Sequence, residues 1–233
     1  MTTANHQPAI AAIVPMRHSS ERIPNKNFRD FEGRPLYRWI IESLLAVPAI
    51  AEVVIDTDSP TITEDARATF PTVRILNRPE HLRDGAIAMN TVLLNSIDQL
   101  DADVFLQTHS TNPLLRPTTI ERAIQTYLKA RKTHDSLFSV TRLQTRLYDH
   151  TGKPINHDPA VLLRTQDLDP VYEENSNIYI FTAETLRRRN NRIGDTPLLF
   201  EIDPLEAVDI DDEHAFRLAQ AIARAGLVTG ETP

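Results

Sequence analysis

The chain has 233 residues, of which 41% are hydrophobic and 24% are charged, with no cysteine and a formal net charge of −7. This length suits one α/β domain with a buried core, and the absence of cysteine excludes a disulfide scaffold, a cysteine-ligated metal and a thiol nucleophile. The acidic balance argues against a nucleic-acid-binding protein, and no apolar run reaches the roughly 18–20 residues of a membrane helix.

In chain order, the first segment, residues 1–8, is polar and lacks the features of a signal peptide, so we expect a cytoplasmic protein. The run 9–14 is apolar throughout, which is typical of a strand buried on both faces of a parallel sheet. Further strands are expected at 53–55, 73–76, 104–106 and 137–140, and helices at 36–48, 62–68, 86–99 and 117–132. Because strand and helix alternate, the sequence predicts an α/β fold with a Rossmann-like, mostly parallel sheet flanked by helices.

The alternation breaks between residues 141 and 175, where the chain is polar and dotted with prolines. Strands are expected again at 177–181 and 198–202, and helices at 183–189 and 212–225. A structureless loop as long as the interrupted stretch would be unusual in a compact domain. We therefore expect a single domain over residues 1–233, with 141–175 as an inserted excursion that serves dimerisation or ligand binding.

The loop after the first strand carries three cations, Arg17, Arg22 and Lys26, and two small hydroxyl residues, Ser19 and Ser20. In open α/β sheets, ligands bind beyond the carboxyl ends of the strands. Arginine binds phosphate as a bidentate fork and lysine binds it as a point charge. The alternative interpretation is a solvated loop that keeps the protein soluble. The position after the first strand favours a triphosphate site made of side chains, since neither a Walker A loop nor a GxGxxG motif occurs in the chain.

The same loop carries a family resemblance. Residues 13–36, IVPMRHSSERIPNKNFRDFEGRPL, resemble the N-terminal signature of the cytidylyltransferases that activate sialic acid and related sugar acids. Five later segments resemble motifs of that family in the same order: VVIDTD at 53–58, RPEHL with Asp84, LQTHSTNPLLR at 106–116, NSNIYIF at 175–181, and DID with Phe216. Any one match is weak, but six in the right order are fairly specific.

The resemblance implies a magnesium-dependent enzyme that transfers CMP from CTP to a 2-keto sugar acid, here called the acceptor, and releases pyrophosphate. It also implies a homodimer that uses the excursion at 141–175. The expected catalytic residues are Arg17, Arg22, Lys26 and Asp211. The expected substrate-binding residues are Ser19, Ser20, Asn27, Arg78, Gln107, His109 and Asn175. For His109, a capping or structural role is an equal alternative to an acceptor contact.

The resemblance assigns the metal to Asp209 and Asp211. Elementary chemistry agrees, because carboxylates at i and i+2 of an extended segment point the same way and Mg²⁺ prefers hard oxygen ligands. A second interpretation of this acidic segment is a helix N-terminus, where carboxylates are stabilised by the helix dipole. We expect both to hold, with Asp212 and Glu213 serving the helix.

Some residues depart from the family pattern. Glu21 stands where many members have lysine, and Arg22 supplies the positive charge one residue later. Glu173 and Glu174 lie where sialic acid synthetases often have an arginine for the acceptor carboxylate, which two glutamates would repel. The sequence thus leaves three possibilities: an acceptor such as an amino-bearing sugar acid, a cytidylyltransferase for a phosphonate or another small acid, and a nucleotide-binding module without catalysis.

Overall fold

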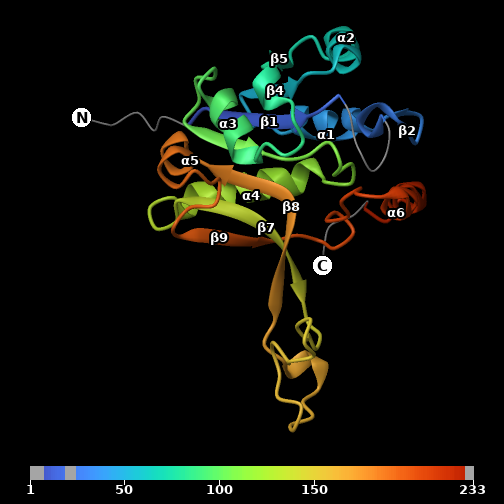
Figure 1. Ribbon diagram of the computed structural model, residues 1–233, viewed down its shortest axis with the longest axis vertical. Coiled ribbons are helices and arrows are strands. Elements are labelled where there is room, and N and C mark those ends of the chain that lie inside the picture. Colours follow the sequence, from blue (N-terminus) through green and yellow to red (C-terminus); the bar gives the residue numbers. More distant parts are fainter. Residues whose placement is uncertain (1–7, 19–24, 229–233) are drawn as a thin grey trace.

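The computed structural model describes residues 8–18 and 25–228, and its main element there is a seven-stranded sheet (Figure 1). The strand order is β5-β4-β1-β6-β8-β7-β9. The strands are β1 (Ile10–Met16), β4 (Glu52–Thr57), β5 (Arg74–Asn77), β6 (Val104–Gln107), β7 (Ser136–Leu143), β8 (Val171–Phe181) and β9 (Pro197–Glu201). All neighbouring strands pair in parallel except β8, which is antiparallel to both β6 and β7. The predicted mostly parallel α/β sheet is confirmed.

Helices cover both faces of the sheet. They are α1 (Leu36–Leu45), α2 (Pro60–Thr69), α3 (Met89–Ile97), α4 (Pro117–Ala130), α5 (Ala183–Arg189) and α6 (Glu213–Ala225). Strand β1 alternates between two buried clusters: Ala12 and Val14 share one with α1, α2 and α4, while Ala11 and Ile13 share the other with α3 and α5. Burial on both faces explains why this strand is apolar at every position. No helix in residues 8–18 and 25–228 combines the length and apolar character needed to cross a membrane.

A small hairpin between β1 and α1 was not expected from the sequence. It pairs β2 (Asp30–Phe31) with β3 (Arg34–Pro35) around Gly33, whose φ of 87° is one that residues with a side chain rarely adopt. A short 3₁₀ helix, η1 (Lys26–Phe28), precedes the hairpin. Phe31 is buried against Phe216 of α6, so the hairpin connects the loop after β1 to the last helix.

Strands β7 and β8 continue beyond the sheet as a two-stranded ribbon that projects from the domain (Figure 1). Residues 144–170 form its tip, which includes a 3₁₀ helix, η3 (Thr165–Asp167). We call the ribbon and tip the arm. The sequence placed the start of β8 at 177, but the strand begins at Val171, because pairing with β7 resumes after a register shift between Phe138 and Val140. Tyr172, Glu173 and Glu174 in the ribbon are exposed, so no apolar periodicity marked this part of the strand.

Candidate active site

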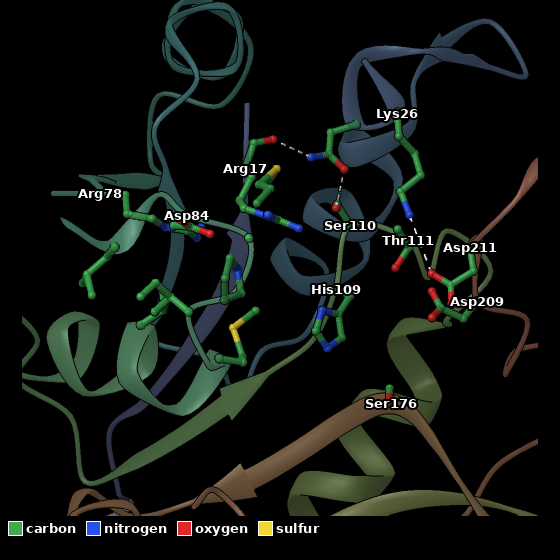
Figure 2. Close-up of a pocket in the computed structure, with 18 of the residues that line it drawn as sticks. Arg17, Lys26, Arg78, Asp84, His109, Ser110, Thr111, Ser176, Asp209 and Asp211 are labelled. Carbon is green, nitrogen blue, oxygen red and sulfur yellow. Dashed lines mark hydrogen bonds and ion pairs between the residues drawn. The ribbon is translucent and has the colours of Figure 1, made fainter. Parts of the chain in front are cut away.

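A cavity of about 480 Å³ lies at the carboxyl ends of β1 and β6 (Figure 2). Its walls come from the segment after β1, the segment between β5 and α3, the loop after β6, and the chain before α6. This is the edge at which α/β sheets bind ligands. The expected site residues on its wall are Arg17, Lys26, Asn27, Arg78, His109, Asp209 and Asp211. Arg22, Ser19 and Ser20 lie outside the described residues.

Lys26 connects the basic loop to the acidic segment. Its ammonium nitrogen donates a hydrogen bond to the carbonyl oxygen of Ile210, 2.6 Å away, and lies 4.0 Å from a carboxylate oxygen of Asp211. Figure 2 shows this side chain extending toward Asp211, with Asp209 beside it. The lysine side chain is only 12% exposed, so its charge acts within the cavity wall rather than in bulk water.

Asn27 connects two loops of the cavity. Its amide nitrogen donates to the carbonyl oxygen of Arg17 at 3.1 Å, and its amide oxygen accepts from the Ser110 hydroxyl at 2.8 Å. Asn25, with a left-handed φ of 54°, begins the turn that leads into η1 and brings Asn27 to this place. Asn27 therefore holds the backbone at Arg17, just after β1, against the loop after β6.

The two aspartates expected to bind metal lie on the same side of an extended segment. Ile210, between them, is completely buried, and its backbone N–H donates to the carbonyl oxygen of Thr111 at 3.0 Å. Since the Ile210 side chain points into the core, Asp209 and Asp211 point the other way and line the cavity. The described residues contain no group of three or more His, Cys, Asp or Glu side chains that could hold a metal ion by themselves.

The next two acidic residues serve α6, as the second interpretation of this segment expects. Asp212 caps the helix, its carboxylate accepting from the backbone N–H of Ala215 at 2.8 Å. Glu213 in the first turn accepts two hydrogen bonds from Arg29, at 2.6 and 3.0 Å. These bonds lower the pKa of Glu213 to about 2. The acidic run is thus divided between the cavity and the helix.

Gln107 and His109 form one hydrogen-bonded unit at the end of β6. The Gln107 amide nitrogen lies 2.9 Å from the Thr108 carbonyl oxygen and 3.0 Å from Nε2 of His109, while its amide oxygen accepts from Arg192 at 2.5 Å. Because the amide nitrogen donates, His109 accepts at Nε2 and carries its proton at Nδ1. Burial, then the charges of Arg192 and Lys26, lower the pKa of His109 to about 3. Its imidazole is therefore neutral at pH 7.

Arg78 borders the cavity, but its guanidinium is directed into the domain. It is 2% exposed, and its Nε donates to a carboxylate oxygen of Asp56, 2.7 Å away. A second nitrogen donates to the Asp56 carbonyl oxygen at 3.1 Å, and Ser96 donates to the remaining carboxylate oxygen at 2.6 Å. This buried pair joins the end of β5 to β4 and α3, which is a structural arrangement.

Asn175 belongs to a second cavity, of about 550 Å³, at the base of the arm. Its side chain accepts from the Ser139 hydroxyl at 2.6 Å and donates to the Thr141 hydroxyl at 3.1 Å, which holds β8 to β7 where they leave the sheet. Glu173 and Glu174 also line this cavity. Ser176, Asp209 and Asp211 line both cavities, so the second cavity adjoins the first.

Several cavity residues were not assigned a role from the sequence. Asp84, Ser110, Thr111, Ser176 and Arg192 line the first cavity. Asp84 could have been found from the sequence, because it belongs to one of the motifs that carry the family resemblance. No sequence motif marked Arg192, because it lies in an irregular segment between α5 and β9 and reaches the cavity only through the tertiary fold.

Comparisons with a protein-family model and with related sequences agree on the family of this chain. The model of the family described as "Cytidylyltransferase" matches residues 11–225. The chain is 28% identical over 232 residues to N-acylneuraminate cytidylyltransferase A of Danio rerio, covering 96% of this chain and 53% of that protein. It is 30% identical over 219 residues to CMP-N,N'-diacetyllegionaminic acid synthase of Legionella pneumophila, covering 87% of this chain and 90% of the other. The chain spans about half the length of the fish relatives it matches.

The fold is also found in solved structures. A structure of CMP:2-keto-3-deoxy-manno-octonic acid synthetase complexed with CTP superposes with a TM-score of 0.71 at 16% sequence identity, covering 94% of this chain and 99% of the other. At that identity the likeness concerns the fold alone. Together with the family match over residues 11–225, these comparisons identify the chain as a member of the cytidylyltransferase family.

Proposed function

We propose that this protein transfers CMP from CTP to a hydroxyl group of a sialic-acid-like 2-keto sugar acid. The observation that carries the proposal is the contact of Lys26 with Ile210, since it joins a basic loop and a pair of aspartates at one cavity. The family membership supports the reaction type, and the relatives that act on N-acylneuraminate and N,N'-diacetyllegionaminic acid support the acceptor class.

In the proposed reaction, an acceptor hydroxyl oxygen attacks the α-phosphorus of CTP. A new phosphorus–oxygen bond forms, the bond from the α-phosphorus to the oxygen shared with the β-phosphate breaks, and pyrophosphate leaves with that electron pair. The hydroxyl proton passes to solvent. Charge builds up on the leaving oxygens, so cations near them lower the barrier. Arg17 and Lys26, on the wall formed by the segment after β1, are the described cations suited to this role.

Asp209 and Asp211 fit a bound Mg²⁺. Magnesium is held in such sites by one or two carboxylates together with water and substrate phosphates, so it does not require a cage of three protein ligands. Both aspartates line the cavity, and the nucleotide would supply the remaining charged ligands. When bound, the ion would neutralise negative charge on the phosphates. The aspartates contribute by holding hard oxygen donors on one side of the extended segment.

We further propose that the protein is a homodimer that pairs through the arm. The tip exposes large apolar side chains, with Leu162 90% exposed, Ile155 58% and Val161 52%. Apolar side chains gathered on a projecting segment are characteristic of a protein–protein interface. A second copy of this chain is the partner that the family resemblance implies.

The decisive experiment measures pyrophosphate release with CTP and the other nucleoside triphosphates against a panel of acceptors, with and without Mg²⁺. The panel contains nine- and eight-carbon 2-keto sugar acids, their amino-bearing analogues, and small phosphonates. We expect release only with CTP, Mg²⁺ and a sugar acid. Release with phosphonates alone would replace the acceptor class. CTP binding without release for any acceptor would reduce the protein to a nucleotide-binding module.

A further inference from the structure

Arg192 is held rigidly at the edge of the first cavity. Its guanidinium carbon lies 3.5 Å from the centroid of the Tyr179 ring, and one terminal nitrogen donates to the Gln107 amide oxygen at 2.5 Å. Gln107 and Tyr179 are direct partners in the pairing of β6 with β8, so the sheet presents both groups side by side. The backbone N–H of Arg192 donates to Asn90 at 3.3 Å. The Arg192 side chain is thus held mainly by an aromatic ring and an amide, with a weaker electrostatic attraction to Glu174.

Several other arginines have carboxylate partners. The arginines of α5 form ion pairs, Arg187 with Asp98, Arg188 with Asp135 and Asp195, and Arg189 with Asp195. The buried Arg78 pairs with Asp56, and Arg116 with Glu206. Within residues 8–18 and 25–228, no carboxylate lies within 4.0 Å of the Arg192 guanidinium. Glu174, whose carboxylate accepts from the Tyr179 hydroxyl, attracts it electrostatically from farther away.

A guanidinium in this state is suited to an anionic ligand. Burial lowers the pKa of Arg192, yet arginine stays protonated in proteins, so the positive charge remains and is poorly solvated. Such a charge is costly unless it is paired. The contacts with Gln107 and Tyr179 occupy only part of its five N–H donors. The remaining donors match the two oxygens of a carboxylate or a phosphonate.

The location of Arg192 separates it from the cations assigned to the triphosphate. Arg17 and Lys26 lie on the wall formed by the segment after β1, whereas Ser176 on β8 lies across the cavity from them (Figure 2). Arg192 stacks on Tyr179 of the same strand, and the Tyr179 hydroxyl oxygen lies 3.1 Å from the Ser176 hydroxyl oxygen. In an in-line displacement, the attacking oxygen approaches from the side opposite the leaving pyrophosphate. The β8 side is therefore the side of the acceptor.

We propose that Arg192 binds the anionic group of the acceptor, a carboxylate in a sugar acid or the equivalent oxygens of a phosphonate. This inference rests on the proposed function for the identity of the acceptor. Gln107 acts as a positioning residue, because its amide oxygen accepts from the guanidinium and its amide nitrogen is anchored to the carbonyl of Thr108. Arg192 thus takes the role that Glu173 and Glu174 cannot fill.

The test uses Arg192→Gln and Arg192→Lys, with Arg187→Gln as the matched control on an exposed ion pair of α5. Acceptor affinity is measured by calorimetry on the full chain with a CTP analogue whose α–β bridging oxygen is a methylene group, so that turnover is not needed. We expect Arg192→Gln to weaken acceptor binding roughly 10- to 100-fold, the value of a hydrogen bond to a charged group. Arg192→Lys retains part of the affinity, and the affinity for the CTP analogue is unchanged in all variants.

A second arm changes the ligand instead of the protein. The wild type is compared with a sugar acid and its carboxamide, and with a matched phosphonate. We expect the carboxamide to bind as weakly to the wild type as the acid binds to Arg192→Gln, and the variant not to distinguish acid from amide. Whichever ligand binds the wild type more tightly, the carboxylate or the phosphonate, identifies the anionic group of the acceptor. If Arg192→Gln does not fold, the carboxamide comparison and Arg192→Lys still decide.

Three results would overturn the assignment: unchanged acceptor affinity in Arg192→Gln, a loss confined to the CTP analogue, or equal binding of acid and carboxamide to the wild type. Failure of the proposed function has a different signature. In that case the wild type binds an acid through Arg192 in the calorimeter but releases no pyrophosphate with CTP and Mg²⁺.

Discussion

The ammonium nitrogen of Lys26 lies 2.6 Å from the carbonyl oxygen of Ile210, a residue 184 positions later in the chain. Ile210 separates the two aspartates of the cavity, so this one hydrogen bond sets the basic loop against the acidic segment. The arrangement keeps a cation close to a carboxylate pair, since the ammonium nitrogen of Lys26 and a carboxylate oxygen of Asp211 are 4.0 Å apart. Both groups line the first cavity, where the proposed function places the CTP phosphates and Mg²⁺.

Replacing Lys26 by Ala removes the cation and its hydrogen bond to Ile210. We expect the KM for CTP to rise roughly 10- to 100-fold, the equivalent of one charge-assisted hydrogen bond, and the Mg²⁺ concentration needed for half-maximal activity to change as well. Steady-state kinetics at varied CTP and Mg²⁺ measures both. Lys132→Ala, an exposed lysine that follows α4, is the control. An unaltered KM for CTP would remove Lys26 from the nucleotide site.

The Arg78–Asp56 pair predicts a loss of stability rather than of substrate binding. Arg78→Met leaves the Asp56 carboxylate buried and without its guanidinium, which costs about 3–5 kcal/mol of unfolding free energy. Urea denaturation of Arg78→Met, Asp56→Ala and the double variant should show that the double change costs less than the sum of the single ones. Arg67→Met on the exposed side of α2 is the control. Normal stability with a raised KM for CTP would instead place Arg78 at the nucleotide.

His109 predicts a defined pH dependence of stability. Its pKa in the folded protein is about 3, whereas a histidine in the unfolded chain has a pKa near ~6.5. Between these values the unfolded chain binds a proton that the folded protein does not. The contribution to stability is therefore fully present above about pH 6.5 and is lost as the pH falls toward 3.

His109→Asn should remove this contribution to the pH dependence of stability. We expect the unfolding free energy of the variant to fall less between pH 7 and pH 5 than that of the wild type, by about 1–2 kcal/mol. Urea denaturation at each pH gives the values. His214→Asn, at an exposed position of α6, should leave the pH dependence as it is in the wild type. Parallel curves for the wild type and His109→Asn would show that the histidine titrates normally.

The arm predicts the oligomeric state. Leu162→Asp places a charge at a side chain that is 90% exposed in the single chain, so the monomer should fold normally while a dimer through the arm loses its apolar contact. Size-exclusion chromatography with light scattering should give a dimer for the wild type and a monomer for this variant. Leu218→Asp, on an exposed part of α6, should stay dimeric. A monomeric wild type would contradict the prediction.

The elements that could be predicted from the sequence are those whose burial leaves a pattern of apolar residues along the chain. Strands such as β1 are buried on both faces, so an unbroken apolar run marks them. The ribbon of β7 and β8 is different. Its two strands leave the sheet and pair with each other, and the local sequence does not reveal this pairing.

The residues of the candidate site likewise include some that the local sequence reveals and some that it does not. Arg17, Lys26, Asp209 and Asp211 follow or precede regular elements, and the fold brings them to one cavity. Arg192 enters that cavity from an irregular loop, so its role depends on the β6–β8 pairing that places Gln107 beside Tyr179. Arg78 was expected near the nucleotide, but the local sequence did not reveal that Asp56 takes up its guanidinium inside the domain.

Strand β8 is one continuous span of 11 residues that starts in the arm and ends in the core of the sheet. Ser176, which has a left-handed φ of 58°, stands where the ribbon joins the sheet and borders both cavities. A partner bound at the arm would therefore be connected, through a single stretch of backbone, to the β8 wall of the first cavity, the proposed acceptor side. Turnover per chain should then fall on dilution, so that specific activity reports assembly as well as chemistry.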